Sequence, residues 1–212
     1  MQLIGMLDSP YVRRVAISMQ LLDLRFEHRS VSVFSTFEQF QQINPVVKAP
    51  TLICDDGTVL MDSTLILQYA EALANSERSL LPTGIAALQR ALRTIGLALA
   101  ACEKSVQIVY EHKLRPAEKL HEPWLNRVTG QLLAAYGELE ADLNSAPSSP
   151  TSKTIDQGGV STAVAWHFTQ QMLPGLVPAS EYPALREFSA KAEALAEFIA
   201  APHGAGTYYR AD

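Results

Sequence analysis

The first residues able to do chemistry lie in Asp8-Ser9-Pro10-Tyr11, between a predicted strand and a predicted helix. Serine followed by proline is typical of a helix start, with serine as the N-cap and proline in the first turn. The N-terminus of a helix presents unpaired N–H groups and a partial positive charge, which suit an anion. The Ser9 hydroxyl is therefore placed either to cap the helix only or to donate a hydrogen bond to a bound thiolate.

A second stretch, Lys48-Ala49-Pro50-Thr51, places a proline directly before a predicted strand. Proline has no N–H to donate to a sheet. If the Ala49–Pro50 peptide bond is cis, the chain turns sharply and leaves the N–H and C=O of Ala49 able to pair with an extended peptide ligand. Most bonds before proline are trans, so this stretch alone does not predict the cis form.

The third stretch is Asp62-Ser63, at the start of another predicted helix. A carboxylate and a hydroxyl at a helix N-terminus can bind an ammonium and a carboxylate together, which is the head of an α-amino acid. The alternative is an ordinary N-cap.

The elements that position these residues follow the order βαβαββα. Apolar runs and turn signals predict strands over residues 2–7, 26–33, 51–54 and 59–61, with Asp55-Asp56-Gly57 as the turn of a hairpin. Helical spacing predicts helices after Ser9 and Ser63 and a short helix over residues 35–42. Residues 75–84 are polar, end in Leu-Pro-Thr-Gly and are expected to link two domains.

Only helices are expected after this linker. Apolar stripes predict two long helices over residues 88–109 and 125–143, and residues 144–153 form a loop rich in serine and proline. Residues 160–172 are apolar on most faces, which predicts a central buried helix. A last amphipathic helix is expected over residues 185–198.

Composition excludes several classes of protein. The net charge is -5, and the pair Arg13-Arg14 is the nearest thing to a basic patch, so neither nucleic acid nor an anionic membrane is an expected partner. The sequence shows no pattern typical of a secretion signal and no uninterrupted apolar run long enough to span a membrane. The two isolated cysteines, Cys54 and Cys102, fit a reducing compartment. The expected location is the cytoplasm.

The five histidines show no paired spacing typical of metal ligands, so no metal site is expected and each is interpreted as a surface or satisfied interior histidine. They are His28, His112, His121, His167 and His203.

Several motifs follow one another along the chain: Ser9-Pro10-Tyr11-Val12-Arg13-Arg14-Val15, Asn44-Pro45, Lys48-Ala49-Pro50-Thr51-Leu52 and Asp62-Ser63. This series resembles the glutathione transferase family, in particular bacterial members with serine at the end of the first strand. The resemblance covers essentially the whole chain, and its most specific part is residues 44–63.

The resemblance implies a thioredoxin-like domain over residues 1–78 and an all-helical domain over residues 85–212. It implies a cis bond before Pro50, with glutathione as a co-substrate and no cofactor. Ala49 would pair with the cysteinyl part, Asp62 and Ser63 would bind the γ-glutamyl head, and Lys48 would lie near the glycyl carboxylate. The complete set of implied glutathione-binding residues is Ser9, Tyr11, Lys48, Ala49, Pro50, Asp62 and Ser63, with Ser9 facing the sulfur.

The expected function is conjugation of the glutathione thiolate to small hydrophobic electrophiles, as in detoxification, by a homodimer that packs through its long helix. Leu7, Tyr110 and Trp166 are expected to line an electrophile pocket between the domains. The alternative is a non-catalytic glutathione-binding or regulatory protein on the same fold. A disulfide reductase is disfavoured because position 9 is serine rather than cysteine.

The chain departs from the family pattern where the sixth helix should begin with a Ser/Thr-x-x-Asp capping box. Here the stretch is Asp156-Gln157-Gly158-Gly159, so Asp156 is available as a cap but the reciprocal acidic residue is missing. The missing bond and the two glycines are expected to weaken this helix start by roughly 1 kcal/mol or more.

Overall fold

The computed structural model describes residues 1–208, apart from the side chain of Ser76. Internal contacts divide the chain into two compact units. The first contains residues 1–82 together with the segment that begins at Ala194, and the second contains residues 83–193. Each unit is described here by itself.

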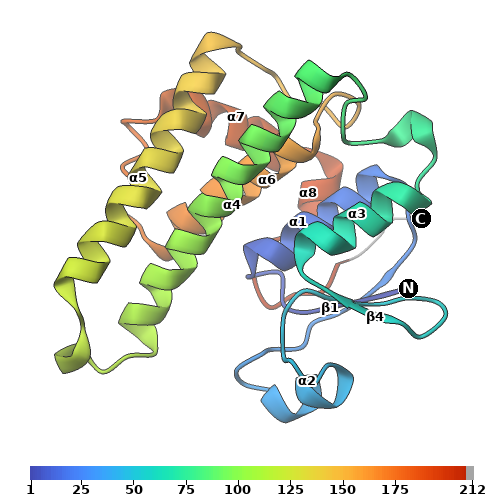
Figure 1. Ribbon diagram of the computed structural model, residues 1–212, viewed down its shortest axis with the longest axis horizontal. Helices are drawn as coiled ribbons and strands as arrows, with labels where there is room; N and C mark the ends of the chain where they lie inside the picture. Colours follow the sequence, from blue (N-terminus) through green and yellow to red (C-terminus); the bar gives the residue numbers. More distant parts are fainter. Residues whose placement is uncertain (209–212) are drawn as a thin grey trace. The chain divides into compact units, whose positions relative to one another are not determined.

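The first unit is built on a four-stranded sheet with the order β2-β1-β3-β4. Its strands are β1 (Gln2–Ile4), β2 (Glu27–Arg29), β3 (Thr51–Ile53) and β4 (Val59–Met61). Strand β1 runs parallel to β2 and antiparallel to β3, and β3 and β4 form the expected hairpin. Helices α1 (Pro10–Leu21) and α3 (Ser63–Leu73) lie on one face of the sheet, and α2 (Phe37–Ile43) lies on the other (Figure 1). The predicted order βαβαββα and the thioredoxin-like fold are confirmed.

The first two strands are shorter than predicted because apolar residues continue beyond them into buried loops. After Ile4 the chain turns at Gly5, whose φ of +137° suits glycine. Leu7 and Val31 are buried although neither lies in a strand. Burial of a loop residue produces the same apolar pattern as a strand, so the pattern overstated both lengths.

Helix α1 is buried on nearly every face, including its two arginines. Arg13 and Arg14 are 2% and 1% exposed, so this pair forms no basic patch on the surface. Arg13 Nε donates to the carbonyl of Ala201 at 2.7 Å, and the Arg13 guanidinium lies over the Phe198 ring, 5.7 Å from its centroid. Arg13 thereby anchors the C-terminal segment to α1.

The last predicted helix is in fact two helices, α7 (Pro183–Glu193) and α8 (Ala196–Ala200), separated by an extended Leu195. The second of these belongs to the first unit, so the observed division differs from the expected helical domain over residues 85–212. The physical reason is that carbonyls of α8 accept hydrogen bonds from Arg13 and Gln20 of α1. These partners lie more than 170 residues away in sequence, beyond the reach of a local periodicity.

His28 ties the sheet to the C-terminal segment. The backbone N–H of Tyr208 donates to His28 Nδ1 at 3.0 Å, so Nε2 carries the proton and donates to the carbonyl of Gly5 at 2.7 Å. Burial lowers the pKa of His28 below its ordinary value, partly offset by the hydrogen bond to Gly5. His28 is therefore a satisfied interior histidine, as expected.

The second unit contains α4 (Ile85–Lys113), α5 (Glu122–Ser145), α6 (Gln157–Met172) and α7. Helix α4 packs against α5 and α6, and α6 is buried over most of its surface, which confirms the prediction of a central buried helix (Figure 1). Short 3₁₀ turns lie at Ser76–Arg78, before α4, and at Ala117–Lys119, between α4 and α5. Within residues 1–208, α4 is the one helix long and apolar enough to span a membrane by those two criteria alone.

A buried polar network joins three helices of this unit. The Tyr136 hydroxyl lies 2.6 Å from Thr169 Oγ1 and donates to the carbonyl of Ala165 at 2.9 Å, and Thr169 in turn pairs with Ser105 at 2.7 Å. Burial raises the pKa of Tyr136 well above its ordinary value, so its proton stays in place. Because each hydroxyl has a partner, this network favours one arrangement of α4, α5 and α6.

The start of α6 shows why glycines replace the missing capping box. Asp156 caps the helix as expected, accepting from the N–H of Gly159 at 2.8 Å. A Cβ at Gly158 would lie 3.2 Å from Thr94 Cγ2. A Cβ at Gly159 would lie 3.0 Å from Ile155 Cγ1 and 3.2 Å from Phe188 Cζ. Close packing of this helix end thus favours the glycines that weaken it locally.

We expect alanine at Gly159 and at Gly130 to change stability in opposite directions. Gly130 lies on the exposed face of α5 with open space where a Cβ would be, so Gly130→Ala should raise the free energy of unfolding by about 0.5–1 kcal/mol. Gly159→Ala should lower it by about 1 kcal/mol or more, because the added methyl overpacks the contact with Phe188. Urea denaturation measures both; equal gains would show that space at Gly159 is not limiting.

Candidate functional site

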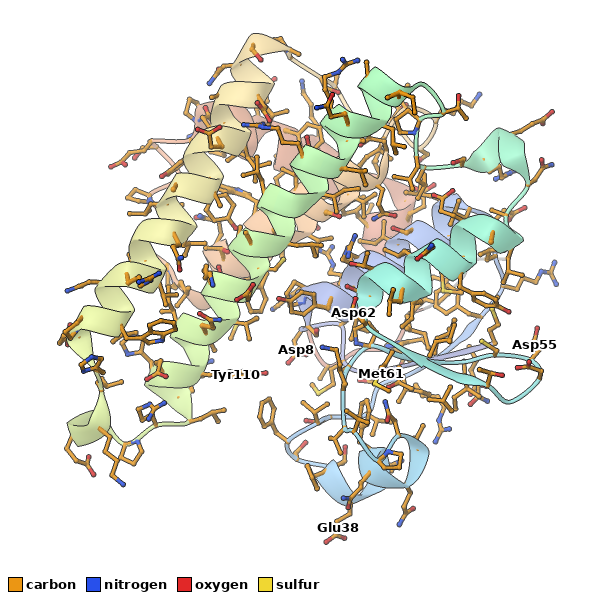
Figure 2. All side chains as sticks on the ribbon, in the orientation of Figure 1. Asp8, Glu38, Asp55, Met61, Asp62 and Tyr110 are labelled. Carbon is orange, nitrogen blue, oxygen red and sulfur yellow. The ribbon has the colours of Figure 1, made fainter. Side chains whose placement is uncertain are left out.

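The three stretches singled out in the sequence meet at one edge of the first unit. The loop after β1 touches the loop before β3, since a Cβ built at Gly5 would lie only 3.2 Å from the Cβ of Ala49. Lys48 Nζ lies 3.8 Å from Asp62 Oδ2. Figure 2 labels Asp8 and Asp62, which lie just before α1 and α3 at this edge. The loop that follows β1, the loop before β3 and the start of α3 therefore lie at one edge of the first unit.

Ser9 is the N-cap of α1. Its Oγ accepts a hydrogen bond from the backbone N–H of Val12 at a long 3.4 Å, and the residue is half-buried. A hydroxyl can accept and donate at the same time, and the Ser9 hydroxyl donates to none of the described residues. The capping role and the thiolate-binding role are therefore compatible. Tyr11, in the next turn, is also half-buried.

The peptide bond between Ala49 and Pro50 is cis, as the family resemblance implied. Among residues 1–208, none forms a hydrogen bond with the backbone N–H or C=O of Ala49. The loop is fixed from below by Asn44, whose side chain donates to Thr51 Oγ1 at 2.8 Å, and Thr51 donates to the carbonyl of Lys48 at 2.7 Å. A backbone edge is thus held in place while its own polar groups stay available.

Asp62 adopts a backbone conformation that is unusual for a residue with a side chain, with φ 72° and ψ 123°. Its Oδ1 accepts from the N–H of Thr64 at 2.9 Å, which caps α3, and its Oδ2 faces Lys48. Such conformations cost on the order of 1–3 kcal/mol and occur often at binding sites. Val47, on the neighbouring loop, also has a positive φ of 52°.

Sequence reasoning missed one residue at this edge. Arg14 Nη1 donates to Ser63 Oγ at 3.0 Å and to Thr64 Oγ1 at 3.4 Å, so a buried guanidinium lies behind the start of α3. The only signal in the sequence was a charged residue within the apolar pattern of α1. That signal does not say which partner the charge has.

The three residues expected to line an electrophile pocket differ in their surroundings. Leu7 is 0% exposed and Trp166 is 4% exposed within the chain, and their place in an electrophile pocket stays a prediction. The Trp166 ring packs edge-on against Tyr136 in the core of the second unit, with ring centroids 5.3 Å apart, because α6 is the central helix of that unit. An aromatic residue on a buried helix serves the core.

Tyr110, by contrast, is 43% exposed and lines an open hollow of about 640 Å³ in the second unit. Leu114, Pro116 and Trp124 supply further apolar walls, and Arg115 and Lys119 lie at the hollow as well.

In the part of the chain that the structure describes, no three His, Cys, Asp or Glu residues gather as a metal site.

Comparison with known proteins supports the resemblance. Residues 3–78 match the family model described as the glutathione S-transferase N-terminal domain. The chain is 25% identical over 175 residues to an uncharacterized GST-like protein, YibF, of Escherichia coli K12, covering 82% of this chain and 86% of YibF.

Solved structures give the same result. A glutathione transferase family member from Pseudomonas fluorescens Pf-5, with bound glutathione, is 28% identical, with a TM-score of 0.78 over 94% of this chain and 97% of that one. A glutathione S-transferase from Methylobacterium radiotolerans, in complex with glutathione sulfonate, has a TM-score of 0.84 over 93% and 92% of the two chains. At 24% identity the latter shows the shared fold alone. The match over residues 3–78, the fold and these structures together show that the chain resembles glutathione S-transferases over most of its length.

Proposed function

We propose that this protein binds glutathione and transfers its thiolate to small hydrophobic electrophiles, with Ser9 as the residue that faces the sulfur. The observation that carries this proposal is the convergence, at one edge of the first unit, of the Ser9 hydroxyl, the unpaired backbone of Ala49 and the start of α3. The Pseudomonas relative, with glutathione bound, supports the same ligand for this chain.

The proposed binding mode follows from the chemistry of each group. The γ-glutamyl ammonium pairs with the Asp62 carboxylate, and its carboxylate accepts from the Ser63 hydroxyl and the first N–H groups of α3. The cysteinyl backbone pairs with the N–H and C=O of Ala49, as an added strand would. Lys48, half-exposed beside Asp62, reaches the glycyl carboxylate. The cysteinyl sulfur then lies at the N-terminus of α1.

Ionising the thiol is the energetic requirement of the reaction, because the thiolate is the nucleophile. Lowering the thiol pKa by about two requires about 2.7 kcal/mol of differential stabilisation. A helix N-terminus supplies about 0.3–2 kcal/mol, and a hydrogen bond to a charged group supplies about 1.5–3 kcal/mol. Ser9 and α1 together are sufficient, so the proposal needs neither a general base nor a metal.

The second candidate is a non-catalytic protein that binds glutathione on the same site. It is favoured by the capping bond of Ser9, which gives that residue a structural role without any chemistry. Binding to immobilised glutathione combined with a conjugation assay separates the two, since a non-catalytic protein would bind without turnover.

Ser9→Ala should lower conjugation much more than it lowers stability. Loss of a hydrogen bond to the thiolate should reduce kcat/KM roughly 10–100-fold and move the rise of activity to higher pH, because the thiol pKa rises without its donor. Loss of the cap should lower the free energy of unfolding by only about 0.5–2 kcal/mol. Conjugation to an aromatic chloride, followed over a pH series, measures the first effect.

Asp156→Ala is the matched control for this variant. It removes a similar N-cap, the bond from Asp156 to the N–H of Gly159, from a helix of the second unit. It should lower stability by a comparable amount and leave the pH profile unchanged. If Ser9→Ala behaves like Asp156→Ala, then Ser9 is a cap only and Tyr11 or backbone N–H groups activate the thiol.

For the electrophile, we propose Tyr110 as a contact, because it is the most exposed of the three expected residues and lines a hollow. Tyr110→Ala should raise KM for an aromatic electrophile several-fold, up to about tenfold, because it removes an aromatic face worth about 0.5–1.5 kcal/mol. KM for glutathione should not change. Tyr110→Phe keeps the ring and should behave like the unaltered enzyme; equal KM values for the electrophile in all three proteins would remove Tyr110 from the site.

We also propose a cytoplasmic homodimer that packs through α4. Ile85 and Leu92 of this helix are 81% and 53% exposed in the single chain, and a partner would cover them. Light scattering at micromolar concentration should give twice the mass of one chain. Leu92→Glu should shift the protein to a monomer, whereas Ile199→Glu, which also alters an exposed apolar residue, should not. A monomer before any substitution would contradict the proposal.

A further inference from the structure

Arg14 is a charged group with almost no access to solvent, set behind the proposed glutathione site. It is 1% exposed, and its Nη1 donates to the hydroxyl oxygens of Ser63 and Thr64. A guanidinium stays protonated in proteins and is unfavourable to bury without partners, and two partners of Arg14 are hydroxyl groups at the start of α3. Resting on the proposed function, we infer that Arg14 is a positioning residue that makes this site selective for the α-carboxylate of the γ-glutamyl head.

The direction of the Arg14 hydrogen bond sets what Ser63 can do. Because Arg14 donates to Ser63 Oγ, a lone pair of that oxygen is occupied and the hydroxyl proton is left to donate elsewhere. A nearby positive charge also polarises the O–H bond and makes it a better donor. Arg14 therefore leaves the Ser63 hydroxyl proton available to donate to a ligand, and Arg14 acts on that ligand through Ser63 rather than by touching it.

The backbone at the start of α3 also offers hydrogen-bond donors, as the Ser63 hydroxyl does. The N–H of Thr64 is taken by Asp62 Oδ1, whereas the N–H groups of Ser63 and Leu65 pair with none of the described residues. With the Ser63 hydroxyl, these N–H groups offer several donors beside the Asp62 carboxylate, and the Arg14 guanidinium lies behind them. The complementary ligand is an acceptor with negative charge, and a carboxylate next to the ammonium that Asp62 binds is such a group.

Arg13 shows that burial of an arginine in α1 does not by itself produce this arrangement. It is 2% exposed and lies one residue away, but it donates to carbonyls of Ala201 and Phe198 in the C-terminal segment. These hydrogen bonds of Arg13 therefore serve packing of α8, while the bonds of Arg14 to Ser63 and Thr64 serve the start of α3. The two residues form a matched pair for an experiment.

The test compares two peptides by isothermal titration calorimetry: glutathione and its analogue without the α-carboxylate, γ-aminobutyryl-cysteinyl-glycine. The unaltered protein should bind glutathione at least about tenfold more tightly than the analogue. Arg14→Gln should weaken glutathione binding about tenfold or more and leave binding of the analogue within about twofold, so that the preference disappears. Arg14→Lys, which keeps the charge, should retain part of the preference.

Arg13→Gln is the control, and it should keep the full preference for glutathione even if it melts earlier. Equal loss of both peptides in Arg14→Gln and Arg13→Gln would mean that Arg14 acts on folding alone, which overturns the inference. An undiminished preference in Arg14→Gln, or in Arg14→Lys if the first variant does not fold, overturns it as well. Failure of the unaltered protein to bind either peptide is a different result, because it removes the proposed function itself.

Discussion

The first unit depends on two buried guanidinium groups that leave α1 in different directions. Arg13 holds the carbonyls at the end of α8, and Arg14 holds the hydroxyls at the start of α3. Each places a permanent charge where water is excluded and hydrogen bonds are strong. Helix α1 is therefore positioned by its polar contacts as well as by its apolar ones, and the proposed site lies at the end of α1 where Ser9 caps it.

The proposed site combines side chains that have partners within the fold with the backbone of Ala49, which pairs with none of residues 1–208. Asn44 and Thr51 hold the loop before β3, and this leaves the N–H and C=O of Ala49 available. Asp62 keeps an unfavourable φ because its side chain both caps α3 and faces Lys48. A rigid support around unsatisfied groups is how a protein prepares a peptide-binding edge before the ligand arrives.

In the second unit, buried polar contacts and close packing hold the long helices in one arrangement. The hydrogen-bonded group of Tyr136, Thr169 and Ser105 links α4, α5 and α6, and the glycines at the start of α6 allow close approach of Thr94 and Phe188. Trp166 packs in this core against Tyr136. Tyr110 remains exposed on α4 and is the one expected electrophile contact with a surface to offer.

Local patterns in the sequence were enough to predict the order of strands and helices and the Ser9, Asp62 and Asp156 caps, because capping residues, turns and apolar periodicity act over a few neighbouring residues. The residues of the glutathione site came from motif resemblance, which also supplied the cis bond before Pro50. The tertiary structure alone decided that Arg13 and Arg14 are buried, that Tyr110 is exposed beside a hollow, and that α8 belongs to the first unit. Each of these depends on contacts between residues that lie far apart along the chain, and the local spacing of residues does not specify such contacts.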